Sequence, residues 1–304
     1  MRAFFDIDRS TTDAVTTNSH KEEGPAMANA TPPDTKKEME TVTSADGTEI
    51  AFERTGRGPP LVLVHGSGVS DHRRWEIAGV RPALAEQVTV YAIDRRGRGM
   101  SEDADTYSLE REVEDVLAVV RAIGEPVVLL GHSYGANIAL EASLMTDAIS
   151  GLILYEPAIA VGDHEMSDPD VVARMSSLLE DGHREDALVV FFREIAGFTS
   201  DDLDVFRADP SWDDRIAGVH TLPREEHAIG AHELRPDRCS DMTAPTLLLS
   251  GGESPERYRD ATQAVDDALP NSRLVIFEGQ QHVAMNNEPE RFVYEVCSFV
   301  EDIA

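Results

Sequence analysis

A five-residue turn, Gly131-His132-Ser133-Tyr134-Gly135, constrains the fold of this chain more than any other segment. It directly follows the apolar run at residues 126–130 and precedes a segment of helical spacing at residues 136–142. A strand that turns this sharply into a helix brings its backbone against neighbouring segments, so glycines are needed two positions before and after the serine. The sequence therefore predicts a strand, a turn and a helix with Ser133 at the apex.

Short apolar runs recur along the chain, with helical stretches between most of them. The runs expected to form strands are residues 60–65, 88–93, 126–130, 152–155, 246–249 and 274–277, preceded by a hairpin at residues 40–43 and 49–54. Continuous apolar runs are typical of strands that are covered on both faces. The clearest helix lies at residues 109–122, and Gly124 follows where it should stop. We therefore expect an α/β fold with a mostly parallel central sheet flanked by helices.

One long interval breaks this alternation and indicates how the chain is divided. Residues 158–242 are amphipathic and helical, without a convincing buried strand, and we expect them to form a cap inserted after the sixth strand. Residues 38–157 and 243–304 then form the core. Residues 1–37 are polar with little periodicity, which predicts a disordered extension in which Met27 is an alternative start.

The charge balance excludes some classes of partner. The chain has 57 acidic and 27 basic residues, a formal net charge of -30, and lysine occurs only at Lys21, Lys36 and Lys37. Such a surface repels nucleic acid. The composition resembles that of proteins from salt-accumulating halophiles, in which high ionic strength screens self-repulsion.

Cysteine usage and hydropathy indicate the compartment. Cys239 and Cys297 lie far apart and form no CxxC pair, which fits a reducing compartment and predicts no metal site of that kind. No apolar run approaches the roughly 20 residues that span a bilayer. We expect a cytoplasmic protein without a membrane partner, and the sequence does not indicate its oligomeric state.

Three further segments carry patterns that fit a serine nucleophile, which needs a base to accept its proton. Residues 64–68 read Val-His-Gly-Ser-Gly, and residues 94–101 read Asp-Arg-Arg-Gly-Arg-Gly-Met-Ser. His282 follows the last expected strand, before Asn-Glu-Pro-Glu at residues 287–290. Together with the serine turn, these motifs resemble the α/β-hydrolase family over residues 40–304, in its serine hydrolase branch with a helical cap.

The resemblance implies a role for several of these residues. Ser133 would be the nucleophile and His282 the general base, and the backbone N–H groups of Ser67 and Tyr134 would form the oxyanion hole. Residues 94–101 would be a scaffold loop beside the site. We expect no metal and no cofactor, because the remaining histidines show no metal-binding spacing.

The acid that orients His282 has two candidates. Relatives commonly place it after the strand at residues 246–249, where this chain has Glu253 one position from the usual place and Ser254 at that place. Serine cannot stabilise an imidazolium as a carboxylate does, so Glu253 is favoured. The alternative is Glu156, at the end of the strand at residues 152–155, because some relatives carry the acid on that loop.

These residues predict a carboxylesterase-like serine hydrolase that acts on a small-molecule carboxylic ester or related acyl compound through an acyl-serine intermediate. The alternatives are a carbon-carbon bond hydrolase, a lactonase, an acyltransferase, a cofactor-free haloperoxidase, or a ligand receptor or pseudoenzyme on the same fold. The aromatic residues of the cap are candidates for an apolar acyl site, although each also suits packing of the cap onto the core. They are Phe191, Phe192, Phe198, Phe206 and Trp212.

Overall fold

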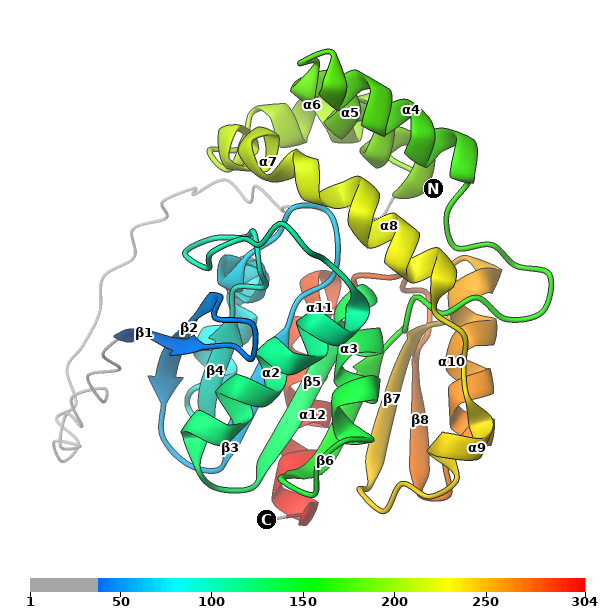
Figure 1. Ribbon diagram of the computed structural model, residues 1–304. Helices are drawn as coiled ribbons and strands as arrows, with labels where there is room; N and C mark the ends of the chain where they lie inside the picture. The colour runs from blue at the N-terminus through cyan, green and yellow to red at the C-terminus, as the bar shows by residue number, and fades with distance from the viewer. Residues whose placement is uncertain (1–37, 304) are drawn as a thin grey trace, which may run out of the picture.

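The computed structural model describes residues 38–303, so the predicted disordered extension and Met27 lie outside the described residues. Eight strands form one sheet in the order β1-β2-β4-β3-β5-β6-β7-β8 (Figure 1). They are β1 Glu38–Thr43, β2 Glu49–Gly56, β3 Pro60–Val64, β4 Thr89–Ile93, β5 Val127–His132, β6 Ile149–Tyr155, β7 Thr246–Gly251 and β8 Ser272–Phe277. β1 with β2 and β2 with β4 are antiparallel, and the other neighbours are parallel. The predicted α/β architecture is confirmed.

The helices and short helical segments alternate with these strands. They are η1 His72–Gly79, α1 Val80–Leu84, α2 Leu109–Ile123, α3 Tyr134–Ser143, α4 Pro169–Glu180, α5 Arg184–Val190, η2 Phe191–Ile195, α6 Ser200–Arg207, α7 Trp212–Gly218, η3 Val219–Thr221, α8 Leu222–Ala231, α9 Pro236–Cys239, α10 Glu256–Ala268, α11 Ala284–Asn287 and α12 Pro289–Ile303. α2 has the expected local signals: Ser108 caps its first turn, and Gly124 ends it with a φ of 76°.

Helices cover both faces of the sheet, and each face has its own apolar core. On one face, α2, α3 and α10 contribute buried side chains such as Val116, Ile138 and Val265. On the other face, α1 and α12 contribute Leu84 and Phe292. Burial on both faces explains why most strands read as continuous apolar runs.

A separate helical layer lies above the carboxyl ends of the strands (Figure 1). It consists of α4 to α8, in the chain interval between β6 and β7, and has an apolar core of its own that includes Phe192, Trp212 and Leu222. Arg98, in the loop after β4, donates hydrogen bonds to Gly218 O at 2.9 Å and to Glu225 at 2.5 Å, and so fastens this layer to the sheet.

β8 differs from the expectation for the run at residues 274–277. Within residues 38–303 it pairs only with β7 and lies at the edge of the sheet, where Ile276 is 43% exposed while Phe277 is buried. The prediction that this strand is covered on both faces is therefore wrong. An apolar run does not reveal whether a strand has one neighbour or two.

Candidate active site

The chain turns at Ser133 as the sequence predicts. Ser133 joins β5 to α3 with a φ of 56° and a ψ of -124°, a strained backbone conformation for a residue other than glycine. A Cβ at Gly131 would lie 2.3 Å from Gly135 O, and a Cβ at Gly135 would lie 2.3 Å from Val64 O. The glycines therefore allow α3 to start against β3 and hold Ser133 at the carboxyl edge of the sheet.

His282, in the loop after β8, is hydrogen-bonded to the carboxylate of Glu156, the residue that follows β6. The distance between His282 Nδ1 and Glu156 Oε2 is 2.6 Å. Glu156 Oε1 accepts hydrogen bonds from Ser250 Oγ at 3.0 Å and from the Gly251 N–H at 2.7 Å. A carboxylate only accepts, so the Nδ1 atom of His282 carries the proton and Nε2 is the ring nitrogen that can act as a base.

The structure corrects the choice between the two acids: it brings Glu156, and not Glu253, to His282. Glu253 is exposed, in the turn after β7, and its N–H donates to Gln280 O at 2.8 Å. Glu156 is fully buried with a φ of 46°, a strained conformation that turns its carboxylate toward the end of β7.

The loop that carries His282 is held by hydrogen bonds from two residues at the carboxyl ends of β6 and β5. The Tyr155 hydroxyl donates to Gln281 O at 2.6 Å and accepts from the Ala284 N–H at 2.7 Å. His132 Nε2 donates to His282 O at 2.9 Å. Burial, together with the charges of His282 and Arg74, holds the pKa of His132 well below its usual range, so this ring stays neutral.

Tyr258, in α10, completes the surroundings of His282. Its ring stacks on the imidazole, with the two ring centres 4.1 Å apart and the planes inclined by 22°. Neither Tyr155 nor Tyr258 is predicted as a site residue from the sequence, because neither belongs to a motif and tertiary folding alone brings both to His282.

The segments predicted to supply the oxyanion donors lie beside Ser133. A Cβ at Gly66 would lie 2.8 Å from Ser133 Cβ, which places the loop that contains Ser67 against the serine. Tyr134 is the first residue of α3, and first-turn N–H groups of a helix have no acceptor within that helix. Arg95 braces this loop, because its Nη1 donates to Gly66 O at 3.1 Å and its guanidinium is paired with Glu112.

Ser133 and His282 line one cavity of about 350 Å³ between the sheet and the helical layer. This volume is within the range of small-molecule sites. Much of its wall is apolar or aromatic, and includes Ala158, Met166, Phe191, Phe192, Phe198, Phe206 and Ile229. Four of the five aromatic candidates from the sequence therefore reach the cavity, whereas Trp212 packs inside the helical layer. The same cavity is lined by Arg74 and Arg215.

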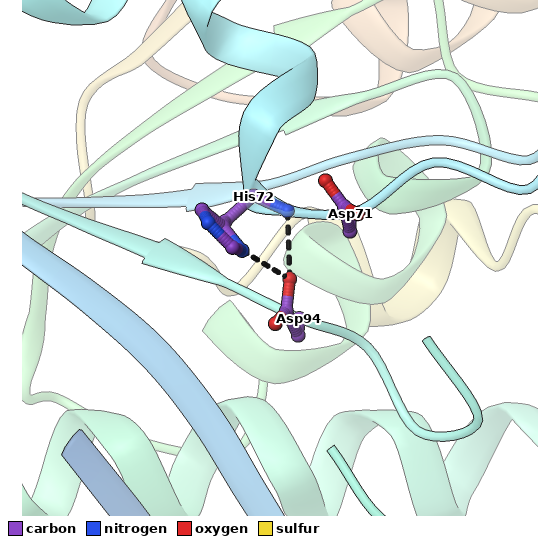
Figure 2. A group of neighbouring side chains, drawn as sticks. All are labelled: Asp71, His72 and Asp94. Carbon is purple, nitrogen blue, oxygen red and sulfur yellow. Dashed lines mark hydrogen bonds and ion pairs between the residues drawn. The ribbon is translucent and has the colours of Figure 1, made fainter. Parts of the chain in front are cut away.

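A second group of polar side chains, Asp71, His72 and Asp94, lies where β4 meets η1 (Figure 2). The His72 N–H and its Nδ1 donate to Asp94 Oδ1 at 2.7 and 2.8 Å, and Asp94 Oδ2 accepts from the Met100 N–H at 2.9 Å. Asp71 caps η1 and is paired with Arg73. Burial lowers the pKa of His72, but the hydrogen bond and charge of Asp94 outweigh it, so the pKa is raised. Protein donors thus already use these carboxylates, and the group joins η1 to the sheet.

Comparison with known proteins shows which family this chain resembles. The chain matches the model of the alpha/beta hydrolase family over residues 61–296. The crystal structure of an alpha/beta hydrolase from Sphaerobacter thermophilus is 37% identical, with a TM-score of 0.72, over 83% of this chain and 99% of that chain. The esterase RhEst1 from a Rhodococcus species is 26% identical, with a TM-score of 0.70, over 88% of this chain and 99% of that chain.

A curated relative, the pimeloyl-(acyl-carrier protein) methyl ester esterase of Aeromonas hydrophila, is 26% identical over 260 residues, which is 83% of this chain and 99% of the relative. Among residues 38–303, no helix is both long enough and apolar enough to cross a membrane. The family match spans most of the sheet and the whole helical layer between β6 and β7. This chain therefore belongs to the α/β-hydrolase family.

Proposed function

We propose that the protein is a serine hydrolase that acts on a carboxylic ester or a related acyl compound. Ser133 is the nucleophile, His282 the general base and Glu156 the acid that orients it. The observation that carries the proposal is the 2.6 Å hydrogen bond between His282 and Glu156 beside the cavity that Ser133 lines. A histidine held by a buried carboxylate, lining the same cavity as a serine on a strained turn, fits the arrangement that acyl transfer requires.

In the first half of the proposed reaction, His282 Nε2 accepts the proton of the Ser133 hydroxyl while Oγ attacks the substrate carbonyl. The negative charge on the carbonyl oxygen is stabilised by the N–H groups of Ser67 and Tyr134. The tetrahedral intermediate then collapses: the bond to the alcohol oxygen breaks, and His282 returns the proton to that oxygen. Glu156 stabilises the imidazolium throughout.

In the second half, water attacks the acyl-serine and His282 accepts its proton. Collapse of the second intermediate releases the carboxylic acid and restores the Ser133 hydroxyl. Two of the similar proteins are named as esterases, which supports a carboxylic ester over the other acyl substrates that this family accepts.

Active-site labelling with a fluorophosphonate tests the proposal. We expect the wild-type protein to be labelled in molar salt and Ser133→Ala to remain unlabelled, while Ser70→Ala, another cavity serine, is labelled normally. Hydrolysis of short-chain 4-nitrophenyl esters should depend on Ser133 in the same way. A folded protein that takes no label would overturn the proposal, and labelling without hydrolysis of any ester would instead favour a receptor.

A further inference from the structure

Three arginines, Arg74, Arg215 and Arg257, line the cavity, although the whole chain has a formal net charge of -30. Arg257 lies over the ring of Tyr258 and donates to Ile195 O at 3.4 Å. Arg74 and Arg215 are the two that contact the segments after β8 and β3. They come from different layers: Arg74 belongs to η1 and Arg215 to α7. Many other arginines of the described residues pair with a carboxylate, as Arg95 does with Glu112. Neither Arg74 nor Arg215 forms such an ion pair within residues 38–303.

The contacts of Arg74 are all with neutral groups. Its Nη1 donates to Asn286 Oδ1 at 2.9 Å, and its Nη2 approaches Met285 Sδ at 3.5 Å. Burial, together with the nearby charge of Arg215, lowers the pKa of Arg74 to about 10. No ion pair with a carboxylate of residues 38–303 therefore offsets the desolvation free energy of the charged Arg74 guanidinium.

Arg215 has a similar environment on the opposite layer. Its Nη1 donates to Gly68 O at 2.7 Å and to Val69 O at 3.3 Å, and its guanidinium carbon lies 5.1 Å from the ring centre of Phe206. Burial lowers the pKa of this guanidinium, although the charge of Asp209 opposes the shift. Two partly buried cations that repel each other therefore lie next to one cavity, and perturbed titratable groups tend to cluster at functional sites.

The acidic residues that line the cavity do not neutralise this pair. Glu194 pairs with Arg174, Asp202 forms the capping box with Thr199, and Glu226 accepts a hydrogen bond from Ser167. A guanidinium has five N–H donors, more than the neutral acceptors of Arg74 use. Donors therefore remain available to a ligand.

Both arginines contact segments that carry the proposed reaction. Arg215 donates to the carbonyl oxygen of Gly68, the residue after Ser67, and Arg74 donates to Asn286, four residues after His282. We propose that Arg74 and Arg215 bind a carboxylate of the substrate, so that the favoured substrates are acyl compounds with a free carboxylate a few bonds from the scissile carbonyl. This inference rests on the proposed hydrolase function. Guanidinium groups suit carboxylates because their hydrogen bonds are charge-assisted.

Two esters of equal length test this inference: mono(4-nitrophenyl) glutarate, which is anionic, and 4-nitrophenyl pentanoate, which is neutral. We expect wild-type kcat/KM to favour the anionic ester at least about tenfold. Arg74→Gln and Arg215→Gln should each reduce that preference, measured as the ratio of kcat/KM for the two esters in the same variant, by roughly tenfold or more, through the KM of the anionic ester. Arg193→Gln, which removes an exposed charge of the same layer outside the cavity, should leave the preference unchanged.

A binding measurement separates this inference from the proposed function. Ser133→Ala protein should bind monomethyl glutarate more tightly than dimethyl glutarate in calorimetry, and a second change, Arg74→Gln, should abolish the difference. Hydrolysis and labelling with no preference for the anionic ester would overturn the carboxylate site and leave the hydrolase proposal standing. Arginine-dependent binding without labelling would overturn the hydrolase proposal alone. If Arg74→Gln does not fold, Arg215→Gln replaces it as the second change in the binding assay, and Arg74→Lys, which keeps the charge, should retain part of the preference. An unchanged preference in Arg215→Gln, in both kinetics and binding, overturns the inference.

Discussion

Glu156 and His282 are 126 residues apart in the chain, and their side chains meet at 2.6 Å. The contact is possible because β6, β7 and β8 are adjacent and parallel, so the loops at their carboxyl ends meet at one edge of the sheet. Ser250 and Gly251, at the end of β7, donate to the other oxygen of Glu156. The strand between the two residues therefore fixes the carboxylate that orients the histidine.

The first prediction concerns the acid. Glu156→Gln replaces the acceptor of the His282 Nδ1–H by an amide that can donate, which favours the wrong tautomer and removes the charge that stabilises the imidazolium. We expect kcat to fall by about 10³- to 10⁴-fold. Glu253→Gln is the matched control, and esterase kinetics of both variants provide the measurement. A large loss in Glu253→Gln with near wild-type activity in Glu156→Gln would restore the expectation drawn from the sequence.

A second prediction concerns Tyr155, whose hydroxyl joins Gln281 and Ala284 in the loop of His282. Tyr155→Phe removes both of these hydrogen bonds and leaves the Ala284 N–H and Gln281 O with only their 3.2 Å bond to each other, which should cost about 1–3 kcal/mol of unfolding free energy. The imidazole should then be less well positioned, so kcat should fall roughly ten- to a hundredfold.

Denaturant titration and ester kinetics measure both effects of Tyr155→Phe. Tyr294→Phe removes a hydroxyl that is exposed to solvent, on a residue 66% exposed, and serves as the control. Wild-type kcat in Tyr155→Phe would show that the loop is held without this hydroxyl.

Local pattern was sufficient to predict the fold class and the positions of Ser133 and His282. Each follows a strand whose apolar run is recognisable, and the glycines around Ser133 are required by backbone contacts within the same turn. The identity of the acid was not predictable in this way. Whether Glu156 or Glu253 contacts His282 depends on the conformation of the loops after β6 and β7. The spacing of residues in the sequence does not determine the distance from either carboxylate to His282.

Arg74 and Arg215 were missed for a related reason. Neither lies in a motif, and each belongs to a short helical segment of ordinary composition. They approach one cavity only when the helical layer is placed over the sheet, which is a property of tertiary packing. The edge position of β8 was likewise hidden, because it depends on the absence of a further strand beside it in the described sheet.

A third prediction tests the turn at Ser133. Gly135→Ala would place a Cβ 2.3 Å from Val64 O and 2.6 Å from His65 O, where neither backbone oxygen can move without disturbing β3. We expect a loss of about 3 kcal/mol of unfolding free energy. Gly230→Ala, in α8 with no atom within 4 Å of the new Cβ, should instead stabilise the protein by about 0.5–1 kcal/mol. Chemical denaturation of both variants would contradict this explanation if their unfolding free energies changed equally.

A fourth prediction concerns Glu226, a buried carboxyl in the cavity wall. Burial raises the pKa of Glu226 to about 7 from a usual value of 4.5. The folded state therefore favours the protonated form, and its stabilising contribution is full below about pH 4.5, declines up to about pH 7 and is constant above. The pKa difference of about 2.5 units corresponds to about 3 kcal/mol.

Glu226→Gln should therefore be as stable as wild type near pH 4.5 and more stable by about 3 kcal/mol above pH 7. Denaturant unfolding at a series of pH values measures this difference. The matched control is Glu180→Gln, which replaces an exposed carboxylate of α4 in the same helical layer. A difference between Glu226→Gln and wild type that does not vary with pH would contradict the raised pKa.

A fifth prediction concerns salt, because the net charge of -30 makes the compact state repel itself at neutral pH. Raising KCl from about 0.1 M to about 1 M shortens the Debye length from about 10 Å to about 3 Å, so it should raise the thermal midpoint. Near pH 4.5, the pI of the chain, the net charge is close to zero and this effect should largely disappear. An equal increase at both pH values would instead indicate general exclusion of salt from the protein surface, which acts whatever the net charge.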